Sequence, residues 1–127
     1  MLRFLSVLVL VVASAASQVI YSVPHKDGVM TLFADASVLY VQAGVEDGFQ
    51  TSYSGGAGSM AARMQGQVSP PADGPVLTTV WTDARGVTHS VATPVPSQTP
   101  QGIQRAVDAH NTLVTTLQQI HPPRPNP

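Results

Sequence analysis

The sequence contains no cysteine, and this absence excludes several kinds of structure and chemistry at once. No disulfide can stabilise the fold, and no lipid can be attached to a cysteine at a leader cleavage site. Zinc sites built from cysteine and catalysis by a thiol are excluded for the same reason. The chain is therefore neither disulfide-linked within itself nor a cysteine-anchored lipoprotein.

Charged side chains are also scarce. The 127 residues include six Lys and Arg and seven Asp and Glu, so charged residues make up 10% of the chain. Soluble domains average about 25%. The formal net charge is −1 and the basic residues are scattered along the sequence. This pattern gives no support for electrostatic binding to nucleic acid or to anionic lipid, and we expect no nucleic-acid partner.

Signatures of catalysis and of cofactor binding are missing as well. The nucleophile pattern G-x-S-x-G is absent, and residues 56–61 read G-x-G-x-x-A without the βαβ unit that dinucleotide binding requires. No two histidines have the close spacing of metal ligands on one helix face; the four are His25, His89, His110 and His121. We therefore predict no catalytic residue, no cofactor and no metal site, in a protein that is not an enzyme.

The N-terminus has the order of a secretory signal peptide. Arg3 precedes an apolar run over 4–12, and the small residues that follow include an A-x-A site that predicts cleavage before Ala16. Cleavage after Ala16 or Ser17 fits the small residues nearly as well, and we assign 1–16 to this signal peptide. The alternative is an uncleaved membrane anchor that extends to about 23, because residues 4–23 carry no charge and reach the roughly 20 residues that a spanning helix needs.

Residues 24–74 have the weakest pattern of the chain. A turn at 24–28 precedes the stretch 29–42, which fits one helix or two short strands, and we favour two strands. The glycine-rich stretch 45–74 reads as a loop in which only 59–65 has the composition of a helix. Such a long loop is unusual in a compact domain, so we expect a mobile binding loop or a segment that a partner orders.

Residues 75–121 predict a hairpin followed by a helix. The β-branched and aromatic residues over 76–82 and 87–93 indicate two strands, and Asp83–Gly86 has the composition of the turn between them. The alternation along these strands places four valines on one face, namely Val76, Val80, Val87 and Val91. We expect this face to be the apolar side of the hairpin.

The helix has clear boundary signals. Thr99 can cap it, Pro100 suits its first position, and two prolines follow His121. Its apolar stripe comprises Ile103, Val107, His110, Leu113, Val114, Leu117 and Ile120. We expect the stripe to pack on the hairpin and the proline-rich tail, 122–127, to be extended and exposed.

Together these elements predict a small single domain of the α+β class. The C-terminal hairpin (about 76–93) packs on one amphipathic helix (about 100–121), and strands from 29–42 complete the sheet. A hydrophobic helix stands at the N-terminus.

Function follows only in outline. We expect an exported protein, secreted or periplasmic, that is not an enzyme and has a binding or structural accessory role, with a protein partner or a second copy of itself. The candidate interaction surface comprises Trp81, His89 and His110. The alternative is a membrane-anchored subunit of a larger assembly, such as a virion or a cell-envelope complex.

Overall fold

The computed structural model describes residues 19–43, 49–68 and 74–125. The signal peptide and the N-terminal hydrophobic helix predicted from the sequence lie outside these residues. The fold is α+β, as predicted: a six-stranded antiparallel sheet packs against a C-terminal helix. Its elements are β1 (Val19–His25), β2 (Gly28–Phe33), β3 (Val38–Ala43), β4 (Phe49–Ser54), α2 (Met60–Val68), β5 (Val76–Thr82), β6 (Thr88–Pro94) and α3 (Pro100–Ile120).

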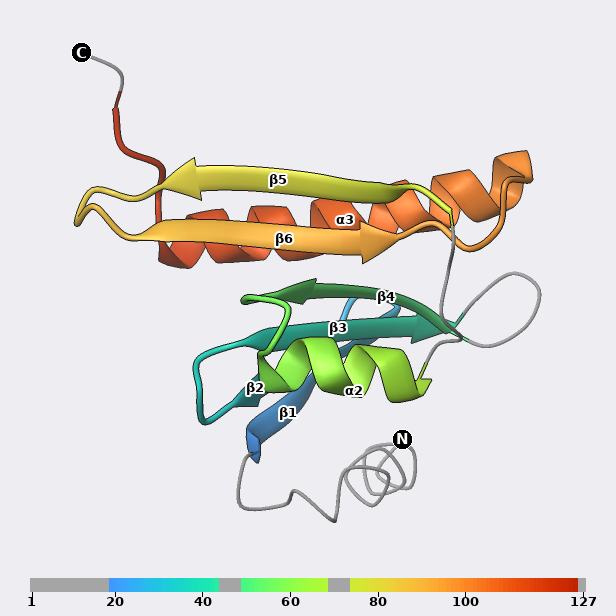
Figure 1. Ribbon diagram of the computed structural model, residues 1–127, viewed down its shortest axis with the longest axis horizontal. Coiled ribbons are helices and arrows are strands. Elements are labelled where there is room, and N and C mark those ends of the chain that lie inside the picture. The colour runs from blue at the N-terminus through green and yellow to red at the C-terminus, as the bar shows by residue number, and fades with distance from the viewer. Residues whose placement is uncertain (1–18, 44–48, 69–73, 126–127) are drawn as a thin grey trace.

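The strands are ordered β1-β2-β3-β4-β6-β5, and the two helices lie on opposite faces of the sheet (Figure 1). Helix α2 packs on β3 and β4, whereas α3 packs across β3, β4, β5 and β6. Strand β3 is buried on both sides because its alternate residues enter different clusters. Tyr40 packs with α3, and Leu39 and Val41 pack with α2.

The prediction of two strands within 29–42 is confirmed by β2 and β3, which pair in antiparallel register. Two further strands were not predicted. Strand β1 occupies residues that the sequence assigned to the end of an anchor or to a turn, and β4 lies in the expected glycine-rich loop. The pattern of β4 is hard to recognise because its buried side chains are polar: Gln50, Thr51, Ser52 and Ser54.

Helix α2 confirms the helical composition noted at 59–65, and the turn between β2 and β3 caps it. The Met60 N–H donates to Asp35 Oδ2 at 2.9 Å, and the Ala61 N–H donates to Ser37 Oγ at 3.1 Å. The Ala62 N–H donates to Ser59 Oγ at 3.2 Å. Three amide groups that a helix start leaves without partners are therefore satisfied.

The β5–β6 hairpin is confirmed, and its turn has the predicted chemistry. Asp83 Oδ1 accepts hydrogen bonds from the Arg85 and Val87 amides, and Gly86 takes the left-handed conformation at φ +86°. The predicted apolar face is wrong: Val76, Val80 and Val87 are each more than half exposed. The strand register pairs Thr79 with Val91, so the face toward α3 carries the odd-numbered residues of both strands.

Helix α3 begins and ends as predicted, with the Thr99 hydroxyl accepting from the Gly102 amide and the C-cap at His121. The predicted stripe is only partly correct. His110, Leu113 and Leu117 are buried, but Ile103 and Ile120 are exposed. The inward face is completed by small residues, which let the helix lie close to the sheet: Gly102, Ala106 and Ala109.

The described part of the tail, 122–125, is exposed as predicted, but it is also attached to the sheet. Asp83 and Pro123 form an antiparallel bridge, and the Arg124 amide donates to the Thr82 carbonyl at 2.8 Å. The tail thus fixes the end of α3 beside the hairpin turn. Within the described residues, no helix has both the length and the apolar character required to cross a membrane.

We predict that Asp35→Ala destabilises the domain by about 1 kcal/mol, because α2 loses a cap. The Ser37 hydroxyl, and then the Met60 amide, hold the pKa of Asp35 below its ordinary value of 3.8. Its stabilising effect is therefore fully present above that value and lost as the pH falls below it. Urea unfolding at about pH 7 and about pH 3 measures both effects. Asp35→Asn is the control, and an unchanged pH response in that variant would contradict the assignment.

Candidate functional site

An apolar cavity of about 300 Å³ lies between α3 and the outer strands of the sheet. It forms because β1 and β2 extend beyond the strands that α3 covers. Paired residues on an antiparallel ladder share a face, so Tyr21 and Val23 lie beside Leu32 and Met30 on the α3 side. The cavity wall consists mainly of Tyr21, Val23, Met30, Leu32, Val38, Leu117 and Ile120.

Several of these apolar side chains remain in contact with water. Tyr21 is 55% exposed, Val23 is 42% exposed and Ile120 is 62% exposed. Single exposed apolar residues are common on protein surfaces, but a group of large ones around a concavity is typical of a binding site. Thr116 also lines the cavity, and its hydroxyl lies 3.2 Å from Nε2 of His25, which ties β1 to α3.

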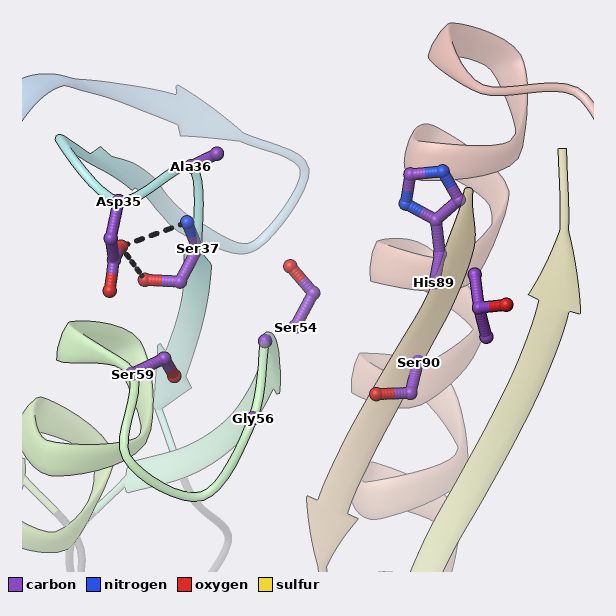
Figure 2. Close-up of a pocket in the computed structure, with 10 residues that line it drawn as sticks. Asp35, Ala36, Ser37, Ser54, Gly56, Ser59, His89 and Ser90 are labelled. Carbon is purple, nitrogen blue, oxygen red and sulfur yellow. Dashed lines mark hydrogen bonds between the residues drawn. The ribbon is translucent and has the colours of Figure 1, made fainter. Parts of the chain in front are cut away.

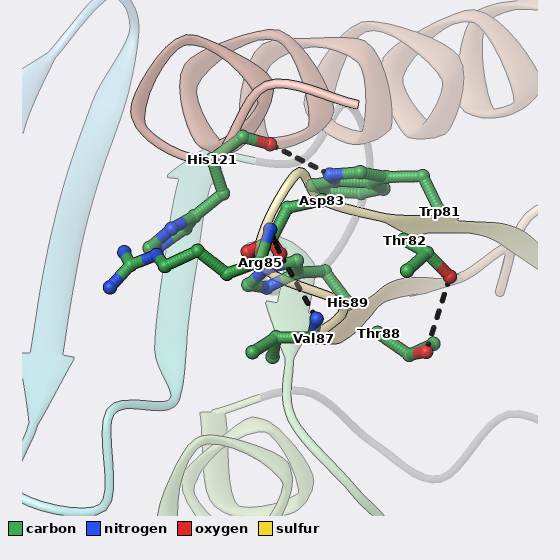
Figure 3. A network of polar contacts seen from close by, with 8 residues as sticks. All are labelled: Trp81, Thr82, Asp83, Arg85, Val87, Thr88, His89 and His121. Atoms are coloured by element: carbon green, nitrogen blue, oxygen red, sulfur yellow. Dashed lines mark hydrogen bonds and ion pairs between the residues drawn. The ribbon is translucent and has the colours of Figure 1, made fainter. Parts of the chain in front are cut away.

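A cluster of polar and aromatic side chains lies at the end of this cavity, where the hairpin turn meets the last turn of α3 (Figure 3). The His89 ring stacks between two others, with its centroid 5.4 Å from Trp81 and 4.4 Å from His121. The Trp81 indole N–H donates to the His121 carbonyl at 2.9 Å. His89 and His121 both line the cavity, so it is polar at this end.

Asp83 organises the cluster from the turn. Its Oδ2 lies 2.8 Å from His89 Nε2, while its Oδ1 accepts the Arg85 and Val87 amides at 2.9 and 3.0 Å. The hydrogen bond with His89, aided by the two amides, lowers the pKa of Asp83 to about 2 against the opposing effect of burial. The carboxylate is therefore ionised at neutral pH, and its side-chain orientation is fixed.

Among the described residues, one group could hold a metal ion: Asp83, His89 and His121. Each offers one ligand atom, and these atoms all lie within 4.8 Å of one another. The sequence did not indicate this group, because its members come from three elements and are up to 38 positions apart. One sequence signal could have indicated part of the group. The hairpin pattern pairs His89 with Trp81, close to the turn residue Asp83.

Of the three residues predicted to form an interaction surface, the structure brings Trp81 and His89 together in one stack, whereas His110 lies in a separate polar network. Trp81 and His110 are 8% and 7% exposed, because both side chains lie between the sheet and α3. His110 is inside a polar network: its Nε2 lies 2.7 Å from Thr79 Oγ1 and its Nδ1 lies 2.9 Å from Thr93 Oγ1. The Thr93 hydroxyl is in turn hydrogen-bonded to Ser52 Oγ at 2.7 Å. The network around His110 therefore links α3 to β4, β5 and β6.

A second, polar cavity of about 250 Å³ lies between the start of α2 and β6 (Figure 2). It shares Ala36, Ser54 and His89 with the apolar cavity. The G-x-G-x-x-A string leads into α2 at this place, but the first amides of α2 already donate to side chains of the protein itself. The helix start therefore does not present free amides to a phosphate group.

Comparisons with protein-family models, with curated proteins and with solved structures find no match for this chain. The function is therefore argued from the cavity and its surrounding residues.

We predict that the stability of the domain falls as the pH decreases below about 6.5, in part through His110. Burial lowers the pKa of His110, so the unfolded chain takes up a proton that the folded chain resists. The stabilisation is present above the ordinary value near 6.5 and is lost as the pH falls through the lower folded value.

The variant His110→Gln tests this prediction. It should cost about 1–3 kcal/mol at pH 8, because the buried Thr93 hydroxyl loses a partner. It should also remove part of the decline in unfolding free energy between about pH 7.5 and about pH 5. His25→Gln serves as the control at a half-buried histidine. An identical pH response in wild type and His110→Gln would refute the role of His110.

Proposed function

We propose that this chain is a small exported protein that is not an enzyme and acts by binding, with the apolar cavity as its binding site. The observation that carries the proposal is the group of large apolar side chains that stay in contact with water around a cavity of about 300 Å³. Leaving such side chains exposed costs free energy, and covering them with a ligand recovers it. Packing of the sheet on α3 alone does not require large apolar side chains to stay exposed around a cavity.

The ligand class follows from the size and polarity of the cavity. A volume of about 300 Å³ is at the lower end of ligand pockets, which are mostly apolar and have a few polar groups that orient the ligand. Here Tyr21, Leu32 and Ile120 supply apolar contact, and His89 and His121 supply polar groups at one end. We infer a small, mainly apolar molecule with one polar end.

Export is supported by the position of β1 relative to the leader. Cleavage before Ala16 leaves β1 whole, since the strand begins at Val19. A spanning helix over 4–23 would instead take residues 19–23 out of β1, whose pairing with β2 forms the cavity wall. The signal-peptide interpretation therefore agrees with the cavity, and on this basis we propose that the protein acts in a periplasm or outside the cell.

We predict that a small apolar fluorescent probe, 1-anilinonaphthalene-8-sulfonate, binds the folded chain and that Val23→Gln weakens this binding by about tenfold. The polar amide removes apolar contact worth about 1–2 kcal/mol. Probe fluorescence and the emission of Trp81, which stacks on His89 beside the cavity, follow the titration.

Val80→Gln is the matched control, because Val80 is 59% exposed on the other face of the sheet. Equal probe affinity in Val23→Gln and Val80→Gln would contradict the proposed site. Size-exclusion chromatography at the titration concentration distinguishes a small ligand from a second copy of the chain. A second copy that fills the cavity would produce a dimer, and Val23→Gln would dissociate it.

We also predict that the protein isolated from its native host begins at Ala16. Removal of residues 1–15 lowers the intact mass by about 1.6 kDa from the 13.3 kDa of the full chain. Mass spectrometry of the purified protein measures this difference. A full-length mass in the alkali-resistant membrane fraction would instead favour the membrane-anchored subunit of a larger assembly.

A further inference from the structure

Three metal-ligating side chains converge where the hairpin turn meets the end of α3. Asp83 follows β5, His89 belongs to β6 and His121 caps α3, and one ligand atom of each lies within 4.8 Å of the others. From this convergence we propose that Asp83, His89 and His121 bind Zn²⁺ or a chemically similar divalent transition-metal ion. This inference is independent of the apolar ligand proposed above.

The distances suit zinc after small side-chain movements. Imidazole nitrogen and carboxylate oxygen bind zinc at about 2.0–2.2 Å, so ligand atoms around a tetrahedral ion are about 3.3 Å apart. The gap of 2.8 Å between Asp83 Oδ2 and His89 Nε2 has to open slightly, and the widest gap has to close. The His121 ring, which stacks on His89 with the centroids 4.4 Å apart, has to rotate so that one of its nitrogens points at the ion.

A buried nitrogen without a hydrogen-bond partner is a second observation that supports a bound ion. His121 Nδ1 is buried and has no hydrogen-bond partner among the described residues. Burying a polar atom without a partner costs free energy, so such atoms in folded proteins usually have a bound group. The turn chemistry explains Asp83, and the Asp83 hydrogen bond explains His89. Stacking on His89 orients the His121 ring, but it supplies no hydrogen-bond partner for Nδ1.

The surroundings of the cluster resemble the outer shell of a metal site. The Arg85 and Val87 amides hold Asp83 Oδ1, which leaves Oδ2 available, and the Trp81 indole holds the His121 carbonyl. Such second contacts orient the ligands before the ion binds. Three protein ligands leave one tetrahedral position open, and two of these ligands, His89 and His121, also line the apolar cavity.

The test is a titration of the purified chain, without an affinity tag, with Zn²⁺ alone. Isothermal calorimetry should show one ion per chain. His121→Gln and His89→Gln should each weaken binding by at least about 100-fold, which exceeds the 10–100-fold typical of outer-shell residues. His25→Gln, at a histidine outside the cluster, should retain the affinity of wild type. Circular dichroism establishes that each variant is folded.

A second measurement uses the wild-type chain and does not depend on any variant. Long-range ¹H–¹⁵N spectra should show Zn²⁺ shifting the ring nitrogens of His89 and His121 while those of His25 and His110 stay in place. Equal shifts of all four rings, binding without saturation at one ion per chain, or full affinity in His121→Gln would each overturn the proposed site.

Discussion

The junction between β4 and β6 is the constraint on which the rest of the structure depends. These strands meet over only two residue pairs, Tyr53 with Ala92 and Ser54 with Val91. Beyond them the contact continues through polar side chains, with the Gln50 amide donating to the Pro94 carbonyl at 2.7 Å. So short a ladder holds two parts of a sheet together only when another element packs across it.

Helix α3 is that element. It contacts strands on both sides of the junction, and His110 adds hydrogen bonds that join the helix to β5 and β6. The same packing places the last turn of α3 beside the hairpin turn and leaves the apolar cavity between α3 and the outer strands β1 and β2. The apolar cavity and the histidine cluster both depend on this placement, since each takes one wall from α3 and the other from the sheet.

Elements with strong local signals could be predicted from the sequence, and the others could not. The Asp83–Gly86 turn and the Thr99 cap depend on hydrogen bonds within a few residues, so their sequence alone was sufficient. Strand β4 was missed because its buried side chains are polar and have hydrogen-bond partners far away in the chain. Ser52, for example, is hydrogen-bonded to Thr93, which is 41 positions away. The buried face of the hairpin was assigned wrongly because alternation along one strand does not reveal which side a distant helix covers.

The candidate site was harder to predict than the fold for the same physical reason. Asp83 was recognised only as a turn residue, and His121 only as the end of a helix. Their approach depends on the bridge between Asp83 and Pro123, which no local pattern shows. The sequence did identify Trp81 and His89, which pair across one hairpin. It also placed His110 on the apolar face of α3, but the hydroxyl partners of His110 could not be predicted because they are far apart in the chain.

The order of elements along the chain has a consequence for biogenesis. Strands β1 to β4 pair with their sequence neighbours, but α3, which supplies Ala109, Leu113 and Leu117 to the larger core cluster, is the last helix to emerge. A chain that becomes available from its N-terminus can therefore form the hairpins of β1 to β4 early, yet it cannot close the larger core cluster until residues 100–120 can join it. The apolar cavity is completed at the same late step, because α3 supplies one of its walls.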